Sequence, residues 1–188
     1  MRPAVVPDSL IAERRRLGLD KRDEVWEGVP HMNEPGSLEH QRLEGRLVTT
    51  LSGVCDSAGL LILPEAGVFD PDVPGYKDFR TPDVVVADRP ATTERGVEGL
   101  AALVVEIRSP GDESFEKIRF YGRIGVAELL IIDRDTKDVR RWVNNGAGTL
   151  TEVPASPDGW HDLAALPVEL RGSAGDLQVR IDGEVQSV

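Results

Sequence analysis

Three apolar segments in the middle of the chain limit its fold more than any other feature of the sequence. They are LLILPEAGVF (60–69), TPDVVVAD (81–88) and ALVVEIRS (102–109). Runs rich in Val, Ile and Leu are typical of buried β-strands. A carboxylate within such a run, as at Glu106, needs a cation, a hydrogen-bond donor or solvent, because an unpaired buried charge costs several kcal/mol.

Two amphipathic segments flank these strands and predict helices. In the first, apolar residues recur at spacings of three and four between Leu43 and Val54, with Ser37 as the expected N-cap and Gly59 at the end. The second helix is expected at 113–125, with Asp112 as its N-cap. Strands on both sides of this second helix predict an alternating α and β chain.

Weaker patterns predict further elements toward both ends of the chain. A short helix is expected at 8–17, and two edge strands are expected to join at Gly28 or Pro30. The tail from Pro154 is rich in Pro, Gly and Ser and contains two weak strand patterns. The strands expected after the second helix are 128–133, 138–143, 148–153, 166–170 and 177–181.

The order of these elements predicts an α/β (α+β) fold, in which a mixed central sheet lies between helices and extra antiparallel strands lie at both ends. A chain of 188 residues fits one domain. We expect that domain to consist of an N-terminal helical arm (1–22), a core (23–153) and a C-terminal β extension (154–188).

Composition excludes several classes of protein. One cysteine rules out an intramolecular disulfide and a cysteine-rich zinc site, and no apolar run approaches the length of a membrane span. We therefore expect a cytoplasmic protein without membrane contact. The formal net charge of −11 is unfavourable for binding nucleic acid, so such binding would need a local basic patch or metal ions.

The acids beside the buried strands suggest a metal site. Asp83 stands at the start of one strand and Glu106 near the end of the next, so the two carboxylates can meet and share a divalent ion, magnesium or manganese. Lys117 on the following helix can reach both acids, and Tyr121 shares its helix face. Such a group can hydrolyse a phosphodiester, because the ion acidifies water and the lysine orients that water or stabilises the transition state.

At these residues the sequence resembles the PD-(D/E)XK nuclease superfamily, through Pro82-Asp83 and Glu106 in an apolar strand. Over about 23–142 it resembles more narrowly the Uma-two family of restriction-endonuclease-like bacterial proteins, in EGVPHMNEPGSLEHQRLEGRL, TPDVVVAD and LVVEIRSPGDESFEKIRFYGRIGVAELLIID. The resemblance implies an α-β-β-β-α-β core, a magnesium-dependent nuclease site and a homodimer. It makes Asp83 and Glu106 metal ligands and Lys117 the catalytic lysine.

One position departs from the superfamily pattern, because Arg108 stands where a lysine is expected two residues after the acid. Arginine stays protonated and cannot act as a base, but it can hold a phosphate or form a salt bridge. Three further residues are candidates with ordinary alternatives. They are Glu65 as a third metal ligand or a solvent-facing strand residue, and His40 and Tyr121 as substrate contacts or structural residues.

The principal residues also have structural interpretations. Glu106 could be a structural acid paired with arginine, Asp83 could cap a turn, and Lys117 could be solvated. Four arginines could form a basic patch or be scattered: Arg119, Arg123, Arg140 and Arg141.

Two hypotheses of function follow from these residues. The first is a metal-dependent endonuclease that acts on nucleic acid, with DNA as the expected partner. The second is a non-catalytic binding or scaffold protein with the same fold. The sequence does not separate a nuclease from a metal phosphatase.

Overall fold

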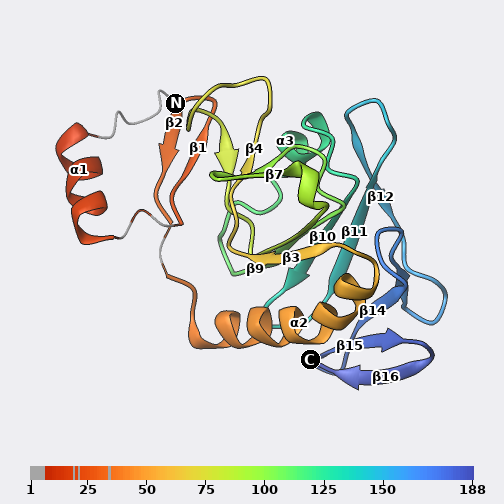
Figure 1. Cartoon of the computed structure of the whole chain (residues 1–188). Coiled ribbons are helices and arrows are strands. Elements are labelled where there is room, and N and C mark those ends of the chain that lie inside the picture. Colours follow the sequence, from red (N-terminus) through yellow and green to blue (C-terminus); the bar gives the residue numbers. More distant parts are fainter. Residues whose placement is uncertain (1–6, 19, 21, 34) are drawn as a thin grey trace.

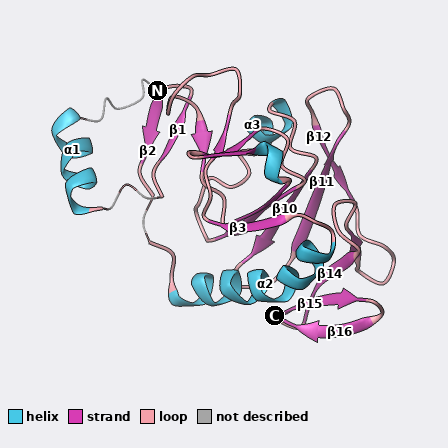
Figure 2. Ribbon diagram, viewed as in Figure 1, coloured by secondary structure: helices cyan, strands magenta, loops and turns pink. Residues whose placement is uncertain are grey.

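The structure is a computed structural model that describes residues 7–18, 20, 22–33 and 35–188. Its centre is a six-stranded mixed sheet in the spatial order β12-β11-β10-β9-β6-β3 (Figures 1 and 2). Strands β9 and β10 pair in parallel, and the other neighbours pair antiparallel. The six strands are β3 (Leu61–Pro64), β6 (Val84–Ala87), β9 (Leu103–Arg108), β10 (Glu128–Asp133), β11 (Val139–Asn144) and β12 (Leu150–Val153).

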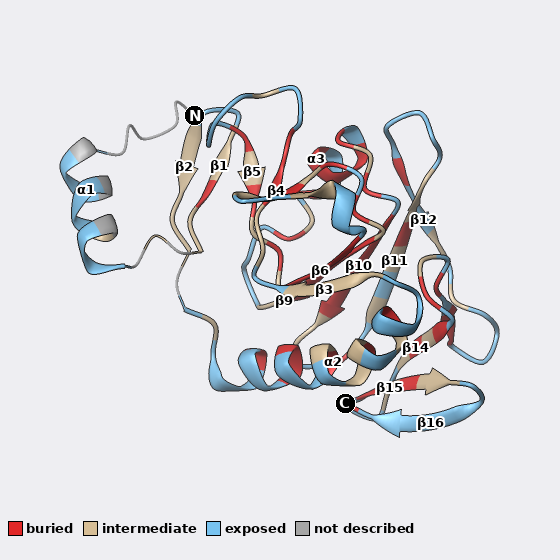
Figure 3. Cartoon of the chain, viewed as in Figure 1, coloured by how far each residue is buried: buried red, intermediate tan, exposed pale blue. Residues whose placement is uncertain are grey.

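The central sheet is covered on both faces, as its apolar strands require. Helix α2 (Leu38–Ser57) and the C-terminal strands cover one face, in a core that takes Val105 from β9. Helix α3 (Ile118–Arg123) and a second sheet cover the other face, in a core that takes Val104. Figure 3 shows the buried residues, in red, concentrated in the central strands and on the inward side of α2. Neighbouring residues of β9 thus enter different cores, because side chains alternate along a strand.

Two smaller sheets complete the fold. One has six short strands in the order β2-β1-β5-β4-β8-β7, and the other has the order β13-β14-β15-β16. All neighbouring strands in these two sheets pair antiparallel, apart from the parallel pair of β4 and β8. The remaining elements are α1 (Asp8–Leu17), β1 (Glu24–Trp26), β2 (Val29–His31), β4 (Val68–Phe69), β5 (Phe79–Arg80), a 3₁₀ helix (Arg89–Ala91), β7 (Thr92–Thr93), β8 (Gly96–Glu98), β13 (His161–Asp162), β14 (Val168–Ser173), β15 (Asp176–Ile181) and β16 (Glu184–Ser187).

The mixed α/β fold expected from the sequence is confirmed. The core elements α2, β3, β6, β9, α3 and β10 occur in the expected α-β-β-β-α-β order, with short strands of the second sheet inserted between β3 and β6 and between β6 and β9. Helix α2 begins where the sequence predicts, since the Ser37 hydroxyl accepts a hydrogen bond from the backbone N–H of His40 at 3.3 Å. It ends before Gly59, whose φ of 72° is a common way to close a helix.

The expectation of one strand over 60–69 is wrong. The chain turns at Glu65, whose φ of 50° is incompatible with an extended strand. Strand β3 therefore stops at Pro64 and pairs with β6, whereas β4 belongs to the second sheet. The turn places Glu65 next to the start of β6.

The expected second helix is also shorter than predicted. Residues 114–117 form turns, and α3 begins only at Ile118. Asp112 does not cap this helix, because its carboxylate accepts hydrogen bonds from the backbone N–H groups of Ser109 and Ser114, at 2.5 and 3.0 Å. It stabilises a turn after Pro110 instead, a role that aspartate often has.

The ends of the chain agree with the sequence in part. Helix 8–17 and the turn at Gly28 are present, but the C-terminal region forms a four-stranded sheet where two strands were expected. Part of the predicted arm, residues 1–6, 19 and 21, lies outside the described residues, so the division into arm, core and extension stays a prediction. None of the helices that the structure describes is long and apolar enough to span a bilayer.

Candidate active site

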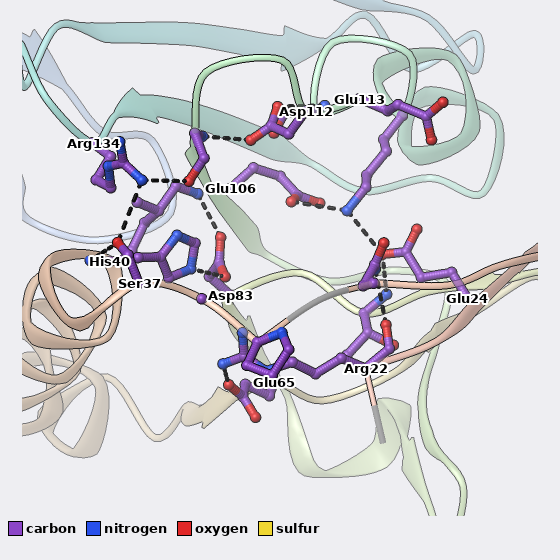
Figure 4. Close-up of a pocket in the computed structure, with 18 of the residues that line it drawn as sticks. Arg22, Glu24, Ser37, His40, Glu65, Asp83, Glu106, Asp112, Glu113 and Arg134 are labelled. Atoms are coloured by element: carbon purple, nitrogen blue, oxygen red, sulfur yellow. Dashed lines mark hydrogen bonds and ion pairs between the residues drawn. The ribbon is translucent and has the colours of Figure 1, made fainter. Parts of the chain in front are cut away.

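The pairing of β6 with β9 brings the two predicted acids together. Asp83 directly precedes β6, and the antiparallel register places Val84 opposite Val105, so Asp83 lies beside Glu106. The Asp83 carboxylate accepts a hydrogen bond from the backbone N–H of Ile107 at 2.6 Å. Figure 4 shows both carboxylates in the same cleft. The two acids thus lie at one end of the central sheet.

Lys117 lies between two buried glutamates. Its ammonium donates to Glu106 Oε2 at 3.0 Å and to Glu24 Oε1 at 2.8 Å. The hydroxyl of Tyr121 donates to the other Glu106 oxygen at 2.5 Å. Lys117 and Tyr121 are four residues apart, so both can reach Glu106 from one side of the α3 segment. The cation that Glu106 needs is therefore Lys117 and not Arg108.

Burial and neighbouring charges shift the proton affinities of this group. Burial raises the pKa of Glu106 to about 8, with Asp83 and Glu24 adding to the rise and Lys117 opposing it. Burial alone would lower the pKa of Lys117, but Glu106 and Glu24 outweigh that effect and hold this pKa above its ordinary value. Lys117 therefore remains a cation at neutral pH, while Glu106 can gain or lose its proton near neutrality.

Glu24 is a site residue that the sequence did not predict. It is 1% exposed, and besides Lys117 it accepts hydrogen bonds from the Thr81 backbone N–H at 2.9 Å and from Trp26 Nε1 at 2.6 Å. The sequence around it, DEVW, has the alternation of an ordinary edge strand. No local signal could have identified it, because its partner Lys117 is 93 residues away.

A second group of side chains lies around Asp83 on the α2 side. His40 Nε2 lies 2.7 Å from an Asp83 oxygen. Glu44 follows one turn later on α2, and one potential ligand atom from each of the three residues lies within 4.8 Å of the others. Burial lowers the pKa of His40, but Asp83 and Glu44 outweigh it and hold this pKa above its ordinary value. Burial raises the pKa of Glu44, and the charge of Asp83 adds to that rise.

Glu65, the third predicted metal ligand, lines the cleft but is already paired. Its carboxylate forms an ion pair with Arg22, which also lies 3.7 Å from Glu44. Its backbone N–H donates to the carbonyl oxygen of Asp83 at 2.9 Å. An ion would have to share Glu65 with Arg22, a residue that the sequence did not single out.

Tyr121 and Arg108, which the sequence predicts as substrate contacts, bind other side chains of the protein. Tyr121 is fully buried under Glu106, so it has no surface to offer a substrate. Arg108 donates to Asp133 at 2.9 Å on the neighbouring strand, and its guanidinium lies 5.4 Å from the Phe115 ring centroid. Neither is among the described residues that line the cleft, whereas His40 is. Tyr121 thus donates a hydrogen bond to Glu106, and Arg108 forms a salt bridge with Asp133.

The predicted basic patch is largely neutralised. Of its four arginines, Arg119 is exposed and the other three are paired with acids. These salt bridges offset the positive charge of three arginines that could otherwise attract a nucleic-acid phosphate. They are Arg123 with Asp70 and Asp78, Arg140 with Glu152, and Arg141 with Glu128.

The cleft that contains these groups has a volume of about 610 Å³. Six carboxylates and three cationic side chains line it, a formal excess of three negative charges when His40 is neutral. A phosphate entering the cleft would be repelled unless further cations were present. The acids are Glu24, Glu65, Asp83, Glu106, Asp112 and Glu113, and the cations are Arg22, Lys117 and Arg134.

The fold places the chain in a structural class of known proteins. It is similar to the crystal structure of a putative nuclease belonging to DUF820 from Anabaena variabilis, with a TM-score of 0.55. The likeness covers 71% of this chain and 78% of that chain, at 16% sequence identity. The class defined by this likeness is a nuclease fold.

The chain belongs to the Uma2, or Uma-two, family, which is described as "Putative restriction endonuclease" and whose sequence profile matches residues 10–179. This match confirms the family resemblance seen in the sequence. A search of curated proteins finds no match to the chain.

Proposed function

We propose that this protein is a divalent-metal-dependent nuclease that hydrolyses phosphodiester bonds in nucleic acid, with DNA as the expected substrate. The observation that carries the proposal is a buried ammonium, that of Lys117, held by Glu106 and Glu24 in the same cleft as Asp83. The family description supports the same class of activity. In this proposal Asp83 and Glu106 hold the ion, and Lys117 assists the reaction.

The residues of the cleft fit a magnesium or manganese ion. The excess of carboxylates there requires added positive charge before a phosphate can enter. Asp83 and Glu106 supply oxygen atoms, the ligands that these cations prefer, and a carboxylate has lone pairs beyond those used in its hydrogen bonds. When bound, the ion would offset charge on the phosphate and make water more acidic.

Lys117 is suited to stabilise charge rather than to remove a proton. Its raised pKa keeps it protonated, so it cannot be a general base. A cation held in a buried position can stabilise negative charge that develops on the phosphate oxygens, with little reorganisation. Glu24 and Tyr121 act as positioning residues, because they hold the Lys117 ammonium and the Glu106 carboxylate in place.

The proposal is tested by cleavage of supercoiled plasmid and of single-stranded DNA in the presence of magnesium or manganese. Asp83→Asn, Glu106→Gln and Lys117→Met should each reduce the rate by about 100-fold or more, as loss of a transition-state interaction does. Glu113→Gln is the matched control, since Glu113 also lines the cleft but is exposed. Equal, metal-independent cleavage by the wild type and all three variants would refute the proposal.

The alternative function, a non-catalytic binding or scaffold protein, is favoured by one observation. The arginines expected to bind phosphate are largely paired with acids of the same chain. Calorimetry separates the two functions, because an intact metal site should bind manganese only when Asp83 and Glu106 are both present. Tight binding of a protein partner without any dependence on metal would favour the alternative.

Three further expectations remain predictions. These are the homodimer, the DNA substrate and the cytoplasmic location. Light scattering during size-exclusion chromatography would measure the oligomeric state directly, and competition between DNA and RNA oligonucleotides would identify the preferred nucleic acid.

A further inference from the structure

We propose that a second pocket, next to the active-site cleft, binds an unpaired nucleobase of the nucleic acid that is cleaved. We call it the aromatic pocket, because Phe69, Tyr76 and Phe79 lie in its lining. Its volume of about 610 Å³ is in the range of small-molecule sites, about 300–1,000 Å³. This inference rests on the proposed function and adds to it a preference for single-stranded or unpaired substrate.

The aromatic pocket adjoins the active-site cleft. Four residues line both cavities: Glu24, Met32, Glu65 and Thr81. Figure 4 shows Glu24 and Glu65 in the cleft that also holds Asp83. A nucleic-acid strand with one phosphate beside Asp83 can therefore place a nearby base in the aromatic pocket.

Tyr76 offers the surface on which a base would stack. Its side chain is 61% exposed. Phe69 and Phe79 stack on each other, with ring centroids 4.9 Å apart and 21° between the ring planes. The Tyr76 ring is nearly perpendicular to both, at 83° and 87°, so at least one of its faces points away from them. Bases of any sequence can stack on an exposed aromatic face of this kind.

The loop that carries Tyr76 is held in place on both sides. The backbone N–H of Gly28 donates a hydrogen bond to the carbonyl oxygen of Lys77 at 2.9 Å. The Arg95 guanidinium donates to the carbonyl oxygen of Gly75. A binding surface that is ordered in advance loses less conformational entropy when its ligand arrives.

The charges of the lining favour a neutral group inside the pocket. Four acids line it, and three of them are paired with cations of the same chain. These pairs are Asp23 with Arg14, Glu24 with Lys117 and Glu65 with Arg22. A phosphate inside the pocket would meet these carboxylates, whereas a nucleobase carries no net charge and avoids that repulsion.

Lys77 offers a contact for the phosphate that joins the base to the strand. It lines the pocket and is exposed. Among the residues that the structure describes, no acid forms an ion pair with its ammonium. The other cation of the lining, Arg95, pairs with Glu98 at 3.0 Å. An aromatic face for the base and a cation for the backbone are the two parts that single-strand binding sites combine.

The test is a fluorescence titration of the full-length protein with a single-stranded DNA oligonucleotide that contains 2-aminopurine, whose emission falls when it stacks. Calcium replaces magnesium, and gel electrophoresis checks that the oligonucleotide stays intact. Tyr76→Ala should weaken binding by about 5- to 150-fold and abolish the quenching, because one base–aromatic stack is lost. Tyr76→Phe keeps the ring and should behave like the wild type. Leu100→Ala, at an exposed apolar residue outside the pocket, is the matched control.

A duplex of the same sequence separates a base pocket from a general surface contact. Paired bases cannot enter the pocket, so Tyr76→Ala should bind the duplex as the wild type does. Equal weakening for single strand and duplex would overturn the proposal. So would single-strand binding that Tyr76→Ala leaves unchanged, or a wild type that binds no single strand. A wild type that binds and quenches but never cleaves with magnesium or manganese would refute the nuclease function and leave the base pocket standing.

Discussion

The two sides of Asp83 compensate buried negative charge in different ways. On the α3 side, two buried glutamates share one internal cation, the Lys117 ammonium. On the α2 side, Asp83 and Glu44 lie against a histidine ring, and the nearest guanidinium is engaged elsewhere. The comparison shows a buried lysine as the counter-charge on the α3 side, whereas on the α2 side the acids raise the pKa of His40 and so favour its protonated form.

The largest effect should come from removing the internal cation. Lys117→Met leaves Glu24 buried without a cation, and breaking a buried ion pair in this way typically costs about 3–5 kcal/mol of unfolding free energy. Urea denaturation in the presence of a chelator measures the loss. Arg119→Met, two residues away and exposed, should change stability little. A loss below about 1 kcal/mol for Lys117→Met would contradict a stabilising α3 side.

The pH dependence of stability should reveal the proton on Glu106. Its folded pKa of about 8 lies above the ordinary value of 4.5, so between these values the native state binds more protons than the unfolded state. Without metal, this contribution is fully present below about pH 4.5 and is lost as the pH rises through about 8. The loss should be of the order of a few kcal/mol. Glu106→Gln cannot titrate, so its curve should lack this decline; identical curves would refute the assignment.

A smaller effect is expected from removing the Tyr121 hydroxyl, which donates a hydrogen bond to Glu106. Tyr121→Phe removes a buried hydrogen bond and little volume, so it should cost about 1–2 kcal/mol of unfolding free energy. Thermal or urea unfolding at pH 8 gives the value. Tyr76→Phe, at an exposed position, is the control and should be nearly neutral. An equal response of the two variants would show that the Tyr121 hydroxyl does not support Glu106.

The smallest effect should occur on the α2 side, in the opposite direction. Glu44→Gln removes a buried charge that lacks a close partner, so without metal it should leave stability within about 0.5 kcal/mol or increase it. Urea unfolding of the wild type and the variant in the presence of a chelator measures the difference. A loss above about 1 kcal/mol in the variant would show that the Glu44 carboxylate stabilises the fold.

Much of the fold could be predicted from local patterns. Apolar runs gave β6 and β9, helical spacing and Ser37 gave α2, and the order of elements gave the nuclease-like core. The errors fell where a local backbone turn interrupts a favourable pattern, at Glu65 and after Pro110. Such turns depend on a few residues and leave the hydrophobic spacing almost unchanged, so the spacing alone did not show them.

The candidate site was less predictable than the fold. Asp83, Glu106 and Lys117 could be chosen because strand ends and helix faces are local properties of a sequence. Local patterns made Arg108 and Tyr121 candidates for substrate contact, but they did not show which side chains these two residues bind. These partners, Asp133 and Glu106, depend on how strands and helices pack.

The sequence by itself determined the order of the core elements from α2 to β10, the acids at the strand ends and the family, because each is encoded in neighbouring residues. Only the tertiary structure decided that Lys117 meets Glu24 across 93 residues, and that His40 and Glu44 converge on Asp83. The physical reason is that a charge responds to distance in space. Chain folding, and not local pattern, sets which cation or proton reaches each buried carboxylate.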